Sequence, residues 1–133
     1  MIYANEFLKD FGMSGGQLPF FMNIVGNPGV SQEDLSKLLR IDKSTTARAV
    51  KSLCINGFVV RKIDKKDKRM YRLYPTGKAL KIKELILREA YNWDTVLLKG
   101  FCKEDRQKIR RALKIMVENA LKYLESEVRE YER

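Results

Sequence analysis

Apolar residues recur at helical spacing from the beginning of the chain. The first strong pattern runs from Gln17 to Val25, where an almost continuous apolar stretch predicts a compact helix. Asn27, Pro28 and Gly29 follow as a turn that closes it. About 16 residues precede this helix, so we expect only a short helix before it.

The next two predicted helices form a short pair. Ser31 is placed to cap the first of them, with Asp34 at the third helical position in the manner of a capping box. Three leucines supply its buried stripe: Leu35, Leu38 and Leu39. We expect this helix to end near Arg40, with Ile41 filling the corner of a tight turn.

The second helix of the pair is predicted from Lys43 to about Asn56, with Asp42 as its cap and Gly57 as its end. Its inner positions share one face: Thr46, Ala49, Val50 and Leu53. The opposite face carries short or basic side chains: Lys43, Ser44, Thr45, Ala47, Arg48 and Lys51. Such a face can enter a DNA groove and still reach phosphates. The pair therefore predicts a helix-turn-helix.

A β-hairpin is expected directly after this helix. Residues 58–63 are rich in β-branched side chains, and residues 71–74 alternate apolar with polar. The polar loop from Asp64 to Met70 joins them. A hairpin with a basic tip beside a recognition helix forms a wing, whose long cations can reach a phosphate backbone or a minor groove.

Two long amphipathic helices complete the pattern. Thr76 caps the first, which runs from Lys78 to about Lys99, and the second begins after Gly100 at Cys102. The apolar stripe of the last helix persists over about five turns: Ile109, Leu113, Met116, Val117, Ala120, Leu121, Leu124 and Val128. One small head cannot cover two such helices, so we expect them to pack against a second copy in a homodimer.

The predicted fold class is mainly α with a small β-wing, a winged helix-turn-helix head plus long terminal dimerisation helices. The length of 133 residues favours a single domain over residues 1–133. Residues 17–77 would form the DNA-binding head, and residues 1–16 and 78–133 the dimerisation helices.

Composition excludes several classes of protein. The chain has no histidine, which excludes a serine–histidine catalytic pair and imidazole metal ligands. We therefore expect that the protein is not an enzyme and that it binds no cofactor and no metal. The two cysteines, Cys54 and Cys102, suit a reducing cytoplasm. Charges interrupt every apolar run before the roughly 20 residues that a membrane span needs, so we expect no membrane partner.

The excess of positive charge lies in one segment. The net charge is +10, from 27 basic and 17 acidic residues. The stretch from Lys43 to Lys81 contains twelve basic residues against only Asp64 and Asp67, and the rest of the chain is balanced. Interleaved charges of both signs would indicate a solvated helix face, but this segment lacks them. The pattern favours an electrostatic footprint for nucleic-acid phosphates.

Five segments follow one another in a specific order and spacing. They are Pro28 to Leu35, Ile41 to Arg48, Gly57 to Arg61, Asp67-Lys68-Arg69, and Leu73 to Gly77. Together they resemble the MarR (multiple-antibiotic-resistance regulator) family of prokaryotic winged helix-turn-helix repressors. The sharpest part is the Asp-x-Arg of the wing followed by Thr-Gly before a long helix.

The resemblance implies a dimer whose terminal helices intertwine and whose two heads bind a palindromic operator on double-stranded DNA. It implies that Ser44, Thr45 and Arg48 lie in the major groove, that Arg69 reaches the minor groove, and that Asp67 orients Arg69 or braces the wing. With their basic neighbours, the predicted DNA-contact residues are Lys43, Ser44, Thr45, Arg48, Lys51, Lys65, Lys66, Lys68 and Arg69.

In many members of the family, a small aromatic ligand or cysteine oxidation releases the DNA. A small aromatic effector is therefore a candidate partner, and four aromatic residues either line its pocket or form plain core, which is the favoured interpretation: Phe20, Phe21, Tyr91 and Trp93. Cys102 is the candidate redox residue, because helix amides and nearby cations favour a thiolate. An inert small residue is the favoured interpretation there, and packing is favoured for Cys54.

The sequence as a whole predicts a cytoplasmic, sequence-specific DNA-binding regulator, with repression as its expected action. Two alternatives remain open. One is an architectural nucleic-acid binder that is indifferent to sequence, and the other is a winged-helix module that binds proteins.

Overall fold

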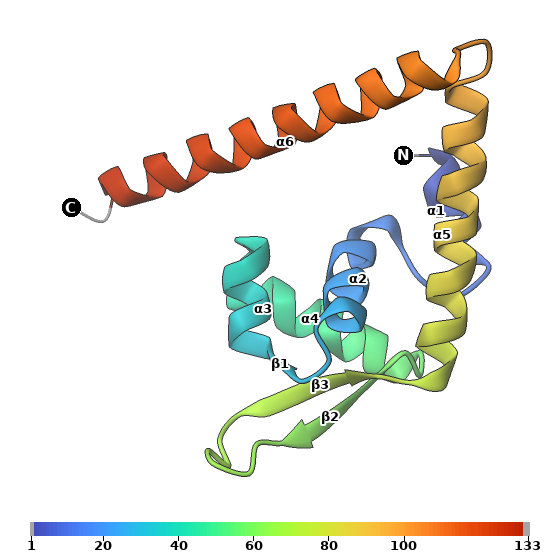
Figure 1. Ribbon diagram of the computed structural model, residues 1–133. Coiled ribbons are helices and arrows are strands. Elements are labelled where there is room, and N and C mark those ends of the chain that lie inside the picture. The colour runs from blue at the N-terminus through green and yellow to red at the C-terminus, as the bar shows by residue number, and fades with distance from the viewer. Residues whose placement is uncertain (1, 132–133) are drawn as a thin grey trace. The chain divides into compact units, whose positions relative to one another are not determined.

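The computed structural model describes residues 2–131, with side chains from residue 5 to residue 124. The chain forms two compact units, Met1–Glu89 and Ala90–Arg133. The elements of the first unit, in chain order, are α1 (Ile2–Lys9), the 3-10 turn η1 (Gly15–Gln17), α2 (Leu18–Gly26), β1 (Val30–Ser31), α3 (Gln32–Leu39), α4 (Lys43–Ile55), β2 (Val59–Ile63) and β3 (Tyr71–Pro75) (Figure 1). The helix α5 (Gly77–Leu97) begins in this unit, and α6 (Lys103–Tyr131) belongs to the second.

Local hydrogen bonds fix the helix-turn-helix formed by α3 and α4, as predicted. Ser31 caps α3, since its Oγ accepts from the Asp34 amide at 3.0 Å and donates to the Asp34 carboxylate at 2.7 Å. Arg40 ends α3 in the left-handed region, with φ 53°. The Ser36 hydroxyl donates to the Ile41 carbonyl at 2.6 Å, which closes the turn. Asp42 then caps α4.

The wing is part of a three-stranded antiparallel sheet with the order β1-β3-β2. The predicted hairpin of β2 and β3 is confirmed, with Arg61 opposite Leu73 and Lys62 opposite Arg72. The strand β1 was not expected from the sequence. It has only two residues, too few for an alternating pattern, and it forms because Val30 pairs with Leu73.

The core of the first unit lies where α2, α4 and the inner face of the sheet meet. Phe21 and Phe58 are fully buried and pack edge to face, with ring centroids 5.7 Å apart. Phe20 is also buried, so the plain-core interpretation of Phe20 and Phe21 is confirmed. The prediction for Leu38 is wrong. Its side chain is 58% exposed, because α3 is so short that Leu35 and Leu39 already cover its inner side.

The second unit contains the end of α5, a turn and α6. Gly100 makes the turn with φ +89°, and Asp94 and Arg110 form an ion pair between the two helices. Large apolar side chains of α6 are exposed in this single chain: Leu113, Ile115, Met116, Val117, Leu121 and Leu124. Val128 of the predicted stripe lies outside the residues whose side chains are described. Within residues 2–131, every helix is too short or too polar to cross a membrane.

Candidate nucleic-acid interface

The outward face of α4 presents the short and basic side chains that the sequence predicts there. Lys43, Ser44, Arg48 and Lys51 are exposed, and Thr45 is half-buried. Arg48 Nη2 donates to Thr45 Oγ1 at 3.1 Å, so the hydroxyl holds the guanidinium against the helix. Arg48 therefore lies beside Thr45 on the exposed face of α4.

The cap of this helix carries a negative charge. Asp42 Oδ1 accepts from the Thr45 amide at 2.9 Å. This hydrogen bond to the Thr45 backbone, together with one from the Thr45 side chain, holds the pKa of Asp42 below its usual value. The first turn of α4 is thereby fixed at the residue where the predicted DNA-contact face begins.

Asp64 organises the wing loop, which we define as residues 64–70. Its Oδ1 accepts from the amides of Lys66 at 2.7 Å and Asp67 at 3.0 Å. Its Oδ2 accepts from Arg72 Nε at 2.6 Å, and Arg72 Nη1 donates in turn to the Gly29 carbonyl at 3.2 Å. The Arg72 guanidinium is the main cause that lowers the pKa of Asp64 to about 2. One carboxylate thus joins the loop to β3 and to the turn before β1.

Asp67 orients Arg69 of the wing loop through its carboxylate. Its Oδ1 accepts from the backbone amide of Arg69 at 3.0 Å and from Arg69 Nε at 3.2 Å. The Arg69 side chain is nevertheless 92% exposed. Arg69 Nη2 also donates to Asp67 Oδ2 at 3.5 Å, so the carboxylate holds one edge of the guanidinium while the group stays open to a partner.

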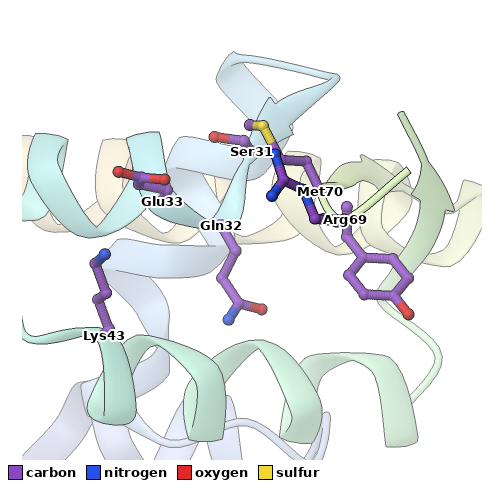
Figure 2. A pocket seen from close by; sticks show the side chains of 7 residues that line it. Ser31, Gln32, Glu33, Lys43, Arg69 and Met70 are labelled. Atoms are coloured by element: carbon purple, nitrogen blue, oxygen red, sulfur yellow. The ribbon is translucent and has the colours of Figure 1, made fainter. Parts of the chain in front are cut away.

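A hollow of about 220 Å³ separates the wing from the helix-turn-helix. Figure 2 shows Lys43 from the start of α4 and Glu33 from the start of α3 on one side, with Arg69 from the wing loop on the other. Gln32 extends between them toward α4. Glu33 forms an ion pair with Lys37 at 3.1 Å. The fold thus brings two of the predicted cations, Lys43 and Arg69, to one opening.

Comparison with known proteins decides the family. A family model described as "MarR family" matches residues 11–70. The uncharacterized HTH-type transcriptional regulator YybA of Bacillus subtilis (strain 168) is 34% identical over 83% of this chain and 73% of its own length. The chain belongs to the MarR family. It is accordingly a MarR-family transcriptional regulator, as the resemblance predicts.

Solved structures of MarR proteins share this fold. A MarR transcriptional regulator from Methanosarcina mazei Go1 superposes with a TM-score of 0.81 at 40% identity, covering 91% of this chain and 87% of its own. A putative MarR family transcriptional regulator from Listeria monocytogenes, solved in complex with 26mer DNA, has a TM-score of 0.73 at 35% identity. That alignment covers 88% of this chain and 78% of the Listeria chain.

Two of the twelve clustered cations of this MarR regulator serve the fold. Arg72 is bound to Asp64 and to the Gly29 carbonyl. Lys78 Nζ donates to the Asn56 carbonyl at 2.7 Å and lies 4.5 Å from the centroid of the Phe58 ring. Charge counting along the sequence cannot separate such residues from those that face a partner.

Sequence reasoning missed the anchoring role of Asp64 and the placement of Gln32. Asp64 had a local signal, because an aspartate at the end of a strand often accepts amides two and three residues ahead in a turn. The hydrogen bond between Asp64 and Arg72 had no such signal in the sequence, because this bond depends on the register of β2 and β3. Gln32 lines the hollow with Arg69 and Met70 of the wing loop, and this neighbourhood depends on the pairing of β1 with β3.

The two cysteines have different surroundings. Cys54 is half-buried against the core, which confirms the packing interpretation. Cys102 is exposed at the start of α6, where its Sγ accepts from the Asp105 amide at 3.5 Å. A redox role for Cys102 stays a prediction. Tyr91 and Trp93 are exposed in the second unit, so the plain-core interpretation does not describe them in this single chain.

Proposed function

We propose that this MarR regulator binds a palindromic operator as a homodimer and represses transcription from it. The observation that carries the proposal is that Lys43, where the exposed basic face of α4 begins, and Arg69 of the wing loop line the same hollow. The Listeria relative, which was solved with 26mer DNA, supports the same use of the head. A regulator that reads chromosomal DNA acts in the cytoplasm.

The residues of the proposed interface divide into two roles. Ser44, Thr45 and Arg48 read base edges in the major groove, where an arginine can donate two hydrogen bonds to guanine. Arg69 enters the minor groove from the wing. The lysines at positions 43, 51, 65, 66 and 68 contact phosphates, and Asp67 keeps Arg69 in place. These lysines make affinity strongly dependent on salt.

The homodimer is proposed from the exposed apolar face of α6. Leu113, Val117 and Leu121 lie on one side of the helix at four-residue spacing, and each is more than half exposed. A patch of this kind is covered in a stable protein. Residues 1–16 and 78–133 are the proposed dimerisation segments, and residues 17–77 the head. Two-fold symmetry then requires half-sites about 10 base pairs apart or a multiple of this.

Operator binding can be tested by fluorescence anisotropy. A binding site is first selected from a random DNA library, and its affinity is compared with that of a scrambled duplex at moderate salt. We expect Arg48→Ala and Arg69→Ala each to cost about 1–3 kcal/mol of binding free energy, roughly 5- to 150-fold in Kd. Arg88→Ala, an exposed site outside the proposed DNA-contact face, is the control, and light scattering checks that this variant keeps the mass of the wild type.

Two outcomes would overturn this proposal. Equal affinity for the selected and the scrambled duplex would favour an architectural binder that is indifferent to sequence. Unchanged DNA binding in both arginine variants would overturn the assignment of the DNA-contact residues. A small aromatic effector remains the proposed signal for release, and it would lower the anisotropy of the operator complex when added.

A further inference from the structure

The outer face of the wing sheet carries a second basic hollow, distinct from the one beside α4. Lys62 of β2 lies opposite Arg72 of β3, and both lie on the face of the sheet away from Leu73, which is fully buried. Tyr74 follows on the same face of β3. The wing loop brings Lys65 and Lys66 to the same place. These side chains line a hollow of about 520 Å³, which we call the outer wing site.

In the outer wing site, the acidic residue has partners within the protein, whereas the lysines form no ion pair among the described side chains. Its carboxylate, Asp64, is fully engaged by Arg72 and by two loop amides. The three lysines, Lys62, Lys65 and Lys66, take part in none of the ion pairs formed within the described side chains. The site therefore keeps a charge of about +3 beside a pair that is already neutral, which favours a polyanion.

Tyr74 and Gly29 shape the floor of the site. Gly29 has φ +90°, and a Cβ at this position would lie 3.3 Å from the Tyr74 hydroxyl oxygen. Glycine thus lets the tyrosine ring lie close to the turn. Lys62 Nζ lies 5.0 Å from the centroid of the same ring. The contact with the ring keeps the Lys62 ammonium group at this hollow, where it can contact a phosphate.

We propose that the outer wing site binds the phosphate backbone of DNA beyond each half-site, so that the footprint of the regulator extends past its palindrome. The inference rests on the proposed function. DNA is the occupant because the site is continuous with the wing loop, where Lys65 and Lys66 are shared with the proposed operator interface. A lysine acts on a phosphate as a point charge, so this contact adds affinity without adding sequence preference.

Two duplexes with the same operator core test the proposal. One ends at the palindrome, and the other carries about 10 further base pairs of arbitrary sequence on each side. We expect the wild-type protein to bind the flanked duplex several-fold more tightly, with a salt slope steeper by roughly one phosphate per half-site. Lys62→Gln should remove this gain and leave affinity for the short duplex unchanged.

Arg61→Gln is the matched control, because Arg61 is the neighbouring residue on the opposite face of β2, where its guanidinium lies 5.9 Å from the Tyr71 ring centroid. This variant should keep the full gain from the flanks. If Lys62→Gln also keeps it, the outer wing site does not bind flanking DNA. Loss of specific binding to the short duplex would instead count against the proposed function itself, so the two failures are distinguishable.

A second arm separates DNA phosphate from a free anion. Inorganic phosphate is titrated into the protein while the backbone amide resonances of Gly29 and Lys66 are followed by NMR. Shifts that the flanked duplex displaces support the proposal. Saturable phosphate binding that persists in the complex with the flanked duplex would overturn it, because the site would then belong to a small anion.

Discussion

Asp64 shows how one side chain can set the shape of a DNA-binding loop. Its two oxygens accept three hydrogen bonds, and its side chain is only 13% exposed. The family resemblance implied that Asp67, three residues further on, orients Arg69 or braces the wing, and the Asp67 carboxylate accepts hydrogen bonds from Arg69 within the same loop. The link from Asp64 to β3 could not be predicted from the sequence, because its partner, Arg72, is a residue of the opposite strand. Position along the chain locates a carboxylate, whereas strand register decides what it binds.

The lowered pKa of Asp64 predicts a specific dependence of stability on pH. Its folded pKa of about 2 lies below the ordinary value of 3.8, so the folded state favours the charged form. The stabilisation is complete above about pH 4 and is lost as the pH falls through about 2. We expect Asp64→Asn to lower the free energy of unfolding at neutral pH and to remove part of its decline between pH 4 and pH 2. Urea denaturation at a series of pH values would check this, with Asp10→Asn as an exposed control. An unchanged pH profile would contradict the role of Asp64.

At the scale of elements, the caps of the head could be predicted and the edge of the sheet could not. Ser31, Asp42 and Thr76 each accept from an amide three residues ahead, so the whole interaction lies within one turn of sequence. The strand β1 depends on β3, more than forty residues further along the chain. The prediction that Leu38 is buried was wrong for a related reason. Helical spacing identifies the apolar face of a helix but does not show how much of that face the neighbouring elements cover.

The cap of α3 should have a measurable energy. Ser31 is 1% exposed, so no water can replace its two hydrogen bonds to Asp34. We expect Ser31→Ala to lower the free energy of unfolding by about 1–2 kcal/mol. Chemical denaturation without DNA measures this change. Ser44→Ala serves as the control, since Ser44 is exposed in the first turn of α4 and its loss should change stability by less than about 0.5 kcal/mol. Equal effects of the two substitutions would refute the role of Ser31 as a cap.

At the scale of the whole molecule, the separation of charge from apolar surface could be predicted closely from the sequence. All of the net charge of +10 lies between Lys43 and Lys81, so a dimer would carry about +20 in its two copies of this segment. The rest of the chain is balanced in charge and includes the exposed apolar face of α6. An isolated chain with this face exposed would be prone to associate. In the proposed dimer, a second copy covers this surface.

The proposed dimer can be broken at one apolar position of α6. Leu121 is 52% exposed in the single chain, and burying a leucine contributes about 1.5–3 kcal/mol. Because two-fold symmetry counts each substitution twice, we expect Leu121→Glu to weaken the dimer by at least about 100-fold. Light scattering after size exclusion should then give the monomer mass, and operator affinity should fall with it, since each half-site is bound separately.

Lys122→Glu is the matched control, because it introduces the same side chain one position further along an exposed part of α6. It should leave both the mass and the affinity unchanged. Circular dichroism of both variants must show unchanged helix content, so that loss of the dimer is not loss of the fold. A Leu121→Glu protein that remains a dimer would mean that the apolar face of α6 is not the dimer interface. A monomer with full operator affinity would mean that one head is sufficient for recognition, and the palindrome would then have no structural basis.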